Sequence, residues 1–148
     1  MIWNGGRVLY EEVYPNILFP MDEDIFELEG NKCIVIGGAY SVDKFYRLRN
    51  GYNWWPDEQP SLAIKEYVEE KVKNNKIDIV FSHTCPYKYI PTECFLSGID
   101  QSKVDNSTEQ WLDTIEEAIE YKAWYLGHWH TDKHIDKMHF LFHGVETL

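Results

Sequence analysis

The segment Trp124–His130 constrains the fold more than any other stretch of the chain. Its apolar residues, Trp124 to Leu126, predict a strand, which Gly127 and a His-x-His pair follow. Side chains two residues apart on an extended backbone share a face, so the imidazoles of His128 and His130 can aim at one point. Gly127 allows the backbone to leave the sheet there or to pass close to a ligand. Open α/β sheets bind ligands at the carboxyl ends of their strands, where this pair lies.

A second strand ends in the same way. The apolar run Ile77–Phe81 leads directly into Ser82 and His83. A helix predicted over 61–73 precedes it, with Ser61 as N-cap and Asn74-Asn75 as the end. The apolar face of that helix consists of Leu62, Ile64, Tyr67, Val68 and Val72. Helix, strand and terminal histidine form half of a βαβ unit, which places the strand of His83 beside Trp124–Gly127.

Another helix is expected to begin near Ser107, because Ser107-Thr108-Glu109-Gln110 offers a cap with an acid and an amide in the first turn. Its buried stripe would be Trp111, Leu112, Ile115, Ala118 and Ile119. The chain should close with a strand over 138–142, and a further strand over 144–148 is a second possibility.

The first half of the chain predicts short antiparallel strands at 8–10 and 17–19, followed by a hairpin over 24–36 whose turn is Gly30-Asn31. The small residues Gly37-Gly38-Ala39 would let another backbone or a ligand approach. The aromatic segment 40–60 predicts either a lid or a packed loop, and we favour the packed loop. Asp43 and Arg47 have the i,i+4 spacing of a surface ion pair.

Length and composition limit the functional classes. A chain of 148 residues predicts one α/β domain spanning 1–148, and three cysteines without a Cys-x-x-Cys spacing predict reduced thiols. We expect a cytoplasmic protein, since neither a secretion signal nor an apolar run of bilayer length occurs. The formal charge of −11 argues against nucleic acid or an anionic membrane as partner. Divalent cations would reverse this repulsion locally for a phosphate substrate.

Three histidines at the ends of two strands predict a metal site. His83, His128 and His130 supply neutral imidazoles, which are ligands for Zn, Mn, Fe or Ni. The remaining histidines, His134, His139 and His143, are interpreted as surface or strand residues. A weaker alternative is a metallo-β-lactamase-like hydrolase, because His128–His134 nearly matches His-x-His-x-Asp-His. Lys133 interrupts that motif, and only fourteen residues follow His134.

The combination of motifs resembles the calcineurin-like metallophosphoesterases, and their bacterial branch in particular. Gly127-His128-Trp129-His130 is similar to the closing Gly-His-x-His motif of the family, and Ser82–Pro86 to its Thr-His-x-x-Pro setting. Further similar stretches, in order and spacing, are Trp3–Val8, Gly37–Lys44, Asn53–Pro56, His130–Lys133 and Phe140–His143. The resemblance covers essentially the whole chain.

The resemblance implies the C-terminal half of a phosphate mono- or diesterase with a two-metal site. It implies an α/β fold, a partial β-sandwich with a mixed sheet flanked by helices. His83 and His128 would bind the second metal and His130 the first. The earlier family motifs, Asp-x-His, Gly-Asp-x-x-Asp and Gly-Asn-His-Glu or Asp, do not precede Trp3, and Asp132-Lys133-His134 lies too late to replace the first.

Ligand charge then predicts the behaviour of this chain. Two cations ~3.5–4 Å apart need anionic bridging ligands, which three imidazoles do not supply. We therefore expect at most one loosely held metal and little or no turnover by this chain alone, with no residue assigned as catalytic. Arg47 or Arg49 could grip a substrate phosphate, although a surface role is an equal alternative.

Two further expectations concern partners. Half a sandwich exposes apolar sheet surface and a strand edge, which predicts a homo-oligomer or a partner chain with the missing half. The alternative function is a catalytically silent domain that binds a partner or a single metal.

Overall fold

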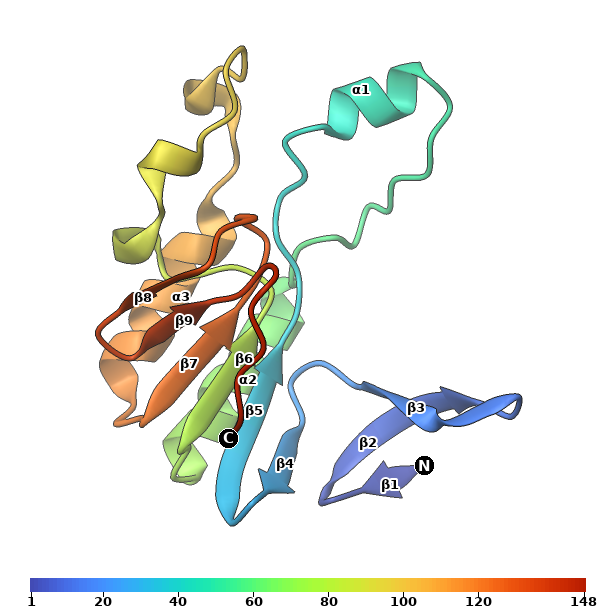
Figure 1. Ribbon diagram of the computed structural model, residues 1–148, viewed down its shortest axis with the longest axis vertical. Helices are drawn as coiled ribbons and strands as arrows, with labels where there is room; N and C mark the ends of the chain where they lie inside the picture. The colour runs from blue at the N-terminus through green and yellow to red at the C-terminus, as the bar shows by residue number, and fades with distance from the viewer.

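The computed structural model describes residues 1–148, which form two sheets and three α-helices (Figure 1). The antiparallel three-stranded sheet contains β1 (Ile2–Trp3), β2 (Gly6–Glu11) and β3 (Tyr14–Pro20). The six-stranded sheet has the order β4-β5-β6-β7-β9-β8, with β4 (Ile25–Leu28), β5 (Asn31–Ile36), β6 (Ile79–Ser82), β7 (Ala123–Leu126), β8 (Lys133–Ile135) and β9 (Met138–Phe140). The helices are α1 (Lys44–Arg49), α2 (Leu62–Asn74) and α3 (Ser107–Ala118), with short 3₁₀ turns at Tyr87–Tyr89, Thr92–Cys94 and Gln101–Lys103. The predicted α/β class with a mixed sheet is confirmed.

The centre of the large sheet is parallel. β5, β6, β7 and β9 run in one direction, with Val80 of β6 opposite Trp124 of β7. The prediction that the strand of His83 lies beside that of His128 is therefore confirmed, and so is the β4–β5 hairpin. Because these strands are parallel, His83 and His128 follow them at the same edge of the sheet.

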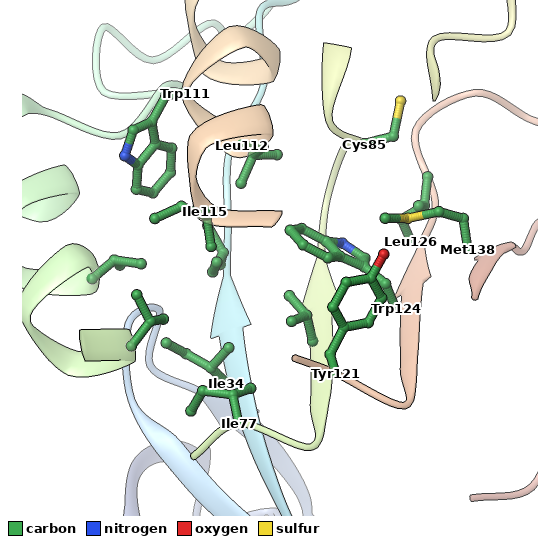
Figure 2. Packing of buried hydrophobic residues seen from close by; sticks show 14 of the residues in the cluster. Ile34, Ile77, Cys85, Trp111, Leu112, Ile115, Tyr121, Trp124, Leu126 and Met138 are labelled. Carbon is green, nitrogen blue, oxygen red and sulfur yellow. The ribbon is translucent and has the colours of Figure 1, made fainter. Parts of the chain in front are cut away.

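One face of the large sheet carries the core, and α2 and α3 cover it (Figure 2). The strands contribute Ile34, Ile36, Val80, Trp124, Leu126, Met138 and Phe140, and the helices contribute Val68, Val72, Trp111, Leu112 and Ile115. Trp124 is fully buried, and its indole N–H donates to Ser82 Oγ at 2.7 Å. That bond links β7 to the last residue of β6, which immediately precedes His83.

The N-cap of α2 is the predicted residue, whereas that of α3 is not. Ser61 caps α2, since its hydroxyl accepts the N–H of Ile64 at 3.3 Å. Ser107 does not cap α3: the N-cap is Asn106, and the N–H of Ser107 donates to Asp105 Oδ1 at 2.9 Å. The chain turns into the helix one residue earlier because Asp105 accepts this otherwise unpaired donor.

The prediction of a packed loop over 40–60 is wrong. The loop extends beyond the sheet and carries α1 with no buried residue (Figure 1). Its exposed aromatic residues are Phe45, Tyr46, Tyr52 and Trp55. The base of the loop is narrow, because the N–H of Ala39 donates to the carbonyl of Glu58 at 3.0 Å. The Glu58 carboxylate also accepts the indole N–H of Trp54 at 2.7 Å, so the loop is held at its base while its tip stays exposed.

The C-terminal part contains a hairpin that the sequence did not indicate. β8 pairs antiparallel with β9 through a turn in which Asp136 has a φ of 51°. β9 lies within the predicted strand at 138–142, whereas 144–148 forms no strand. The three cysteines are unpaired, as expected. None of the helices combines the length and the apolar character needed to cross a bilayer.

Candidate functional site

His83 and His128 meet at the carboxyl edge of the parallel strands. Nδ1 of His128 lies 3.1 Å from Nε2 of His83, and the ring centroids are 4.9 Å apart in an edge-on arrangement. The backbone fixes this approach, because the N–H of His83 donates to the carbonyl of Ile36 and the N–H of Gly127 to that of His83. Two nitrogens at this separation suit one metal ion with both rings as ligands.

The turn that presents His128 is strained. The N–H of Trp129 donates to the carbonyl of Gly127 at 2.7 Å, closing a three-residue turn in which His128 has a φ of 64°. His130 also has a positive φ, of 50°. Non-glycine residues rarely adopt this conformation, and each instance costs roughly 1–2 kcal/mol. Such strain is concentrated at functional sites.

Gly127 has a different role from the one expected. Its φ is not in the left-handed region, and an added Cβ would meet only the carbonyl oxygen of Leu141 at 3.8 Å. The chain therefore changes direction through the two histidines themselves.

Burial lowers the pKa of both paired rings and so favours their neutral forms. Desolvation, with further contributions from His83 and His130, lowers the pKa of His128 to about 4. Desolvation also lowers the pKa of His83, and nearby Asp22 partly opposes this effect. Neutral imidazoles with free lone pairs are the form that binds metal.

His130 lies close to the pair but does not complete a compact group. Its charge acts on both other rings, and its own ring stacks on Phe142 with centroids 4.8 Å apart. The group of His, Asp and Glu residues whose ligand atoms all lie within 4.8 Å of one another is a different one, His134, His139 and Glu146. The structure thus brings together two of the three predicted ligands, with the third beside them.

Asp22 is a site residue that the sequence analysis missed. It lies in the connection between β3 and β4 and acts electrostatically on His83. Desolvation raises the pKa of its carboxyl, and His83 opposes the shift. A Cβ at Gly37 would come within 2.4 Å of the Asp22 carboxylate, so the glycine makes room for this acid. No motif marks Asp22, because its proximity to His83 arises only when β4 and β5 pair.

A buried polar group supports the strand end from behind. Thr84 donates to Glu109 Oε1 at 2.8 Å, and both residues are buried. Desolvation raises the pKa of Glu109, and burial raises that of the neighbouring Cys85 thiol to about 12. Cys85 is therefore a thiol at neutral pH and not a thiolate ligand.

The predicted phosphate ligands lie on α1. Arg47 Nε donates to Asp43 Oδ2 at 2.7 Å, which confirms the i,i+4 pair, and Arg49 is exposed without an ion pair. Neither arginine makes a hydrogen bond with the histidine pair, because the 40–60 loop holds α1 away from the sheet (Figure 1). A cavity of about 600 Å³ lies at the opposite end of the sheet, near Asn4, Lys32 and Asn75.

Comparison of the chain with protein-family models, with curated proteins and with solved structures gives no match.

Proposed function

We propose that this chain carries the histidine part of a metal-dependent phosphoesterase site, with His83 and His128 as ligands of a divalent cation. One observation carries the proposal: two imidazoles that follow adjacent parallel strands meet with nitrogens 3.1 Å apart, one of them on a strained turn. Stability alone would not favour that conformation of His128. Mn, Fe, Zn and Ni all accept such ligands.

The chemistry of the proposed site would depend on the charge of the bound divalent cation. A divalent ion bound there would polarise a phosphoryl oxygen and lower the pKa of a bound water. His83 and His128 would hold the ion as neutral ligands. Asp22 is a nearby carboxylate, and His130, which stacks on Phe142, interacts electrostatically with both rings. The pair His83 and His128, with Asp22 and His130 nearby, would hold at most one ion.

Hydrolysis through two ions needs bridging carboxylates that this set does not contain. We propose that a polypeptide carrying the Asp-x-His, Gly-Asp-x-x-Asp and Gly-Asn-His motifs completes the site, on the same chain or on another. Substrates would be phosphate mono- or diesters, and the site would work in the cytoplasm. Arg49 has no ion-pair partner, so it would be the freer of the two arginines to bind a substrate phosphate.

The second candidate is a catalytically silent domain that binds a partner or one metal. The small sheet favours it, because many apolar side chains of β1–β3 and their turn are exposed: Ile2, Leu9, Tyr10, Val13, Tyr14, Ile17 and Phe19. Exposed apolar surface of this kind is typical of an interface, either with a second copy or with the completing polypeptide.

The first experiment measures the number of metal ions bound per chain. Metal content and hydrolysis of p-nitrophenyl phosphate and its bis ester are measured for wild type, for H83A/H128A and for the control H143A. We expect wild type and H143A to hold one ion per chain more than the double variant, with little or no turnover. Equal metal content in all three would overturn the proposal, and turnover by this chain alone would refute the need for further ligands.

The second experiment separates the two candidates. The chain is combined with a polypeptide that carries the three additional motifs. Hydrolysis that appears in wild type and is lost in H83A/H128A supports the phosphoesterase. Continued silence of a complex that binds metal at His83 and His128 supports the silent domain.

A further inference from the structure

A second cluster of ligating side chains lies away from His83 and His128. His134 of β8 and His139 of β9 are direct cross-strand partners, with ring centroids 4.4 Å apart. The C-terminal segment brings Glu146 to both: Oε1 lies 2.6 Å from His134 Nε2 and Oε2 lies 2.7 Å from His139 Nδ1. Residues opposite each other on antiparallel strands share a face, so the two rings reach a common point without strain.

The C-terminal segment is anchored where Glu146 needs it. The Asp132 carboxylate accepts the backbone N–H groups of Phe142, His143 and Gly144, at 2.7, 3.1 and 2.9 Å. These three bonds turn the chain back after β9, and Figure 1 draws the segment after β9 running back along the sheet. The ring of Tyr125 packs against His139 at 4.6 Å between centroids and limits its rotation. Glu146 and His139 are thus positioned by other residues, as ligands of a built site are.

The cluster is open to solvent on one side. His134 and Glu146 line a cavity of about 400 Å³, and the His134 side chain is 58% exposed, against 20% for His139. An ion can therefore enter past His134. The excess of acidic over basic residues in the chain also favours the approach of cations over anions.

We propose that His134, His139 and Glu146 form a binding site for a first-row divalent cation of the zinc type, separate from the pair His83 and His128. Two imidazoles and one carboxylate are a ligand set of open zinc sites, with a further position left for water or another ligand. Their ligand atoms already lie within 4.8 Å of one another. Donors about 2.0–2.2 Å from a tetrahedral zinc ion lie ~3.4 Å apart, so the carboxylate would retreat from each ring by less than ~1 Å.

The test isolates this cluster from the first. Untagged H83A/H128A protein is titrated with Zn²⁺ by calorimetry and with Co²⁺ by visible absorption. H134N and E146Q are each added to that background, and H143N is the matched control, because His143 lies between His139 and Glu146 in sequence but outside the cluster. We expect one ion per chain in the background and in H143N. Affinity should fall at least tenfold in H134N and in E146Q.

NMR provides a readout that does not depend on affinity. Co²⁺ in the background protein should broaden the side-chain signals of His139 and Tyr125 before those of residues at the far end of the sheet. His134 is largely exposed, so H134N should fold even if E146Q releases the C-terminal segment. Absence of Zn²⁺ binding below roughly 1 mM, or unchanged affinity in H134N, would overturn the proposal and leave Glu146 as a structural tether only. Neither result bears on metal at His83 and His128, which the background lacks.

Discussion

The strained turn at 127–130 predicts whether glycine or alanine gives the more stable protein at each of its positions. A protein with glycine at a given position is normally less stable than one with alanine there, by about 0.5–1 kcal/mol, because glycine loses more backbone entropy on folding. The order reverses where φ is positive, because Cβ then meets the following carbonyl oxygen. His128 and His130 have φ values of 64° and 50°, and Gly127 lies outside the left-handed region with space for a Cβ.

We therefore expect opposite preferences at neighbouring positions. H128G and H130G should each be more stable than H128A and H130A, by about 1–2 kcal/mol. G127A should be neutral or more stable than wild type, by up to about 1 kcal/mol. The comparison of glycine with alanine at one position removes the imidazole in both variants, so lost ring contacts cancel and only the backbone term remains.

The measurement is urea unfolding at pH 7, with stability from linear extrapolation and a check that the m-values agree. His128 is neutral at that pH, because its pKa is lowered to about 4, so its charge does not contribute. Equal stabilities of the alanine and glycine variants at 128 and 130 would refute the assignment of strain. A large loss in G127A would show that the turn depends on the glycine after all.

Of three further predictions, two are tested by urea unfolding and one by NMR. G38A should be less stable than G51A by about 1–3 kcal/mol, because both have positive φ but a Cβ at Gly38 would also come within 2.7 Å of a backbone oxygen; equal losses would contradict the predicted collision. Hydrogen bonds from Arg7 hold the pKa of Asp24 below its usual value. The loss of stability in R7M relative to wild type should therefore be largest near neutral pH and should shrink as acid protonates Asp24. Urea unfolding of both proteins from pH 7 to 3 measures this difference. The pKa of His128, measured by NMR titration, should lie well below 6.5. The stability that the neutral, buried ring contributes should then be complete above about pH 6.5 and decline as the pH falls towards 4. A normal pKa would mean that the ring is solvated.

The parts of the fold that sequence predicts are those with a strong local signal. The amphipathic pattern and Ser61 determine α2, and the apolar runs before His83 and Gly127 determine β6 and β7. Their parallel pairing then brings His83 and His128 together, since a shared strand direction puts both ends at one edge. Periodicity and topology were sufficient for this half of the site.

The parts that sequence missed depend on contacts between distant segments. β8 has three residues and no alternation, and its pairing with β9 is what makes His134 and His139 neighbours. Asp22 approaches His83 only through the space left at Gly37. The aromatic segment 40–60 misled the prediction because aromatic content indicates a core only when the chain can reach one. In this segment the hydrogen bond between Ala39 and Glu58 closes the loop at its base, and the aromatic residues beyond it stay exposed.

The narrow base of the 40–60 loop suggests that the chain can be divided into two pieces. Its basic residues Lys44, Arg47 and Arg49, none of them buried, offer cleavage sites to a protease specific for basic residues. β5 and β6 on either side stay joined by strand pairing. A single cut there would leave fragments that remain associated through the intact sheet. The loop could consequently be opened, shortened or replaced by an inserted domain while the two strand ends that carry the histidines keep their places.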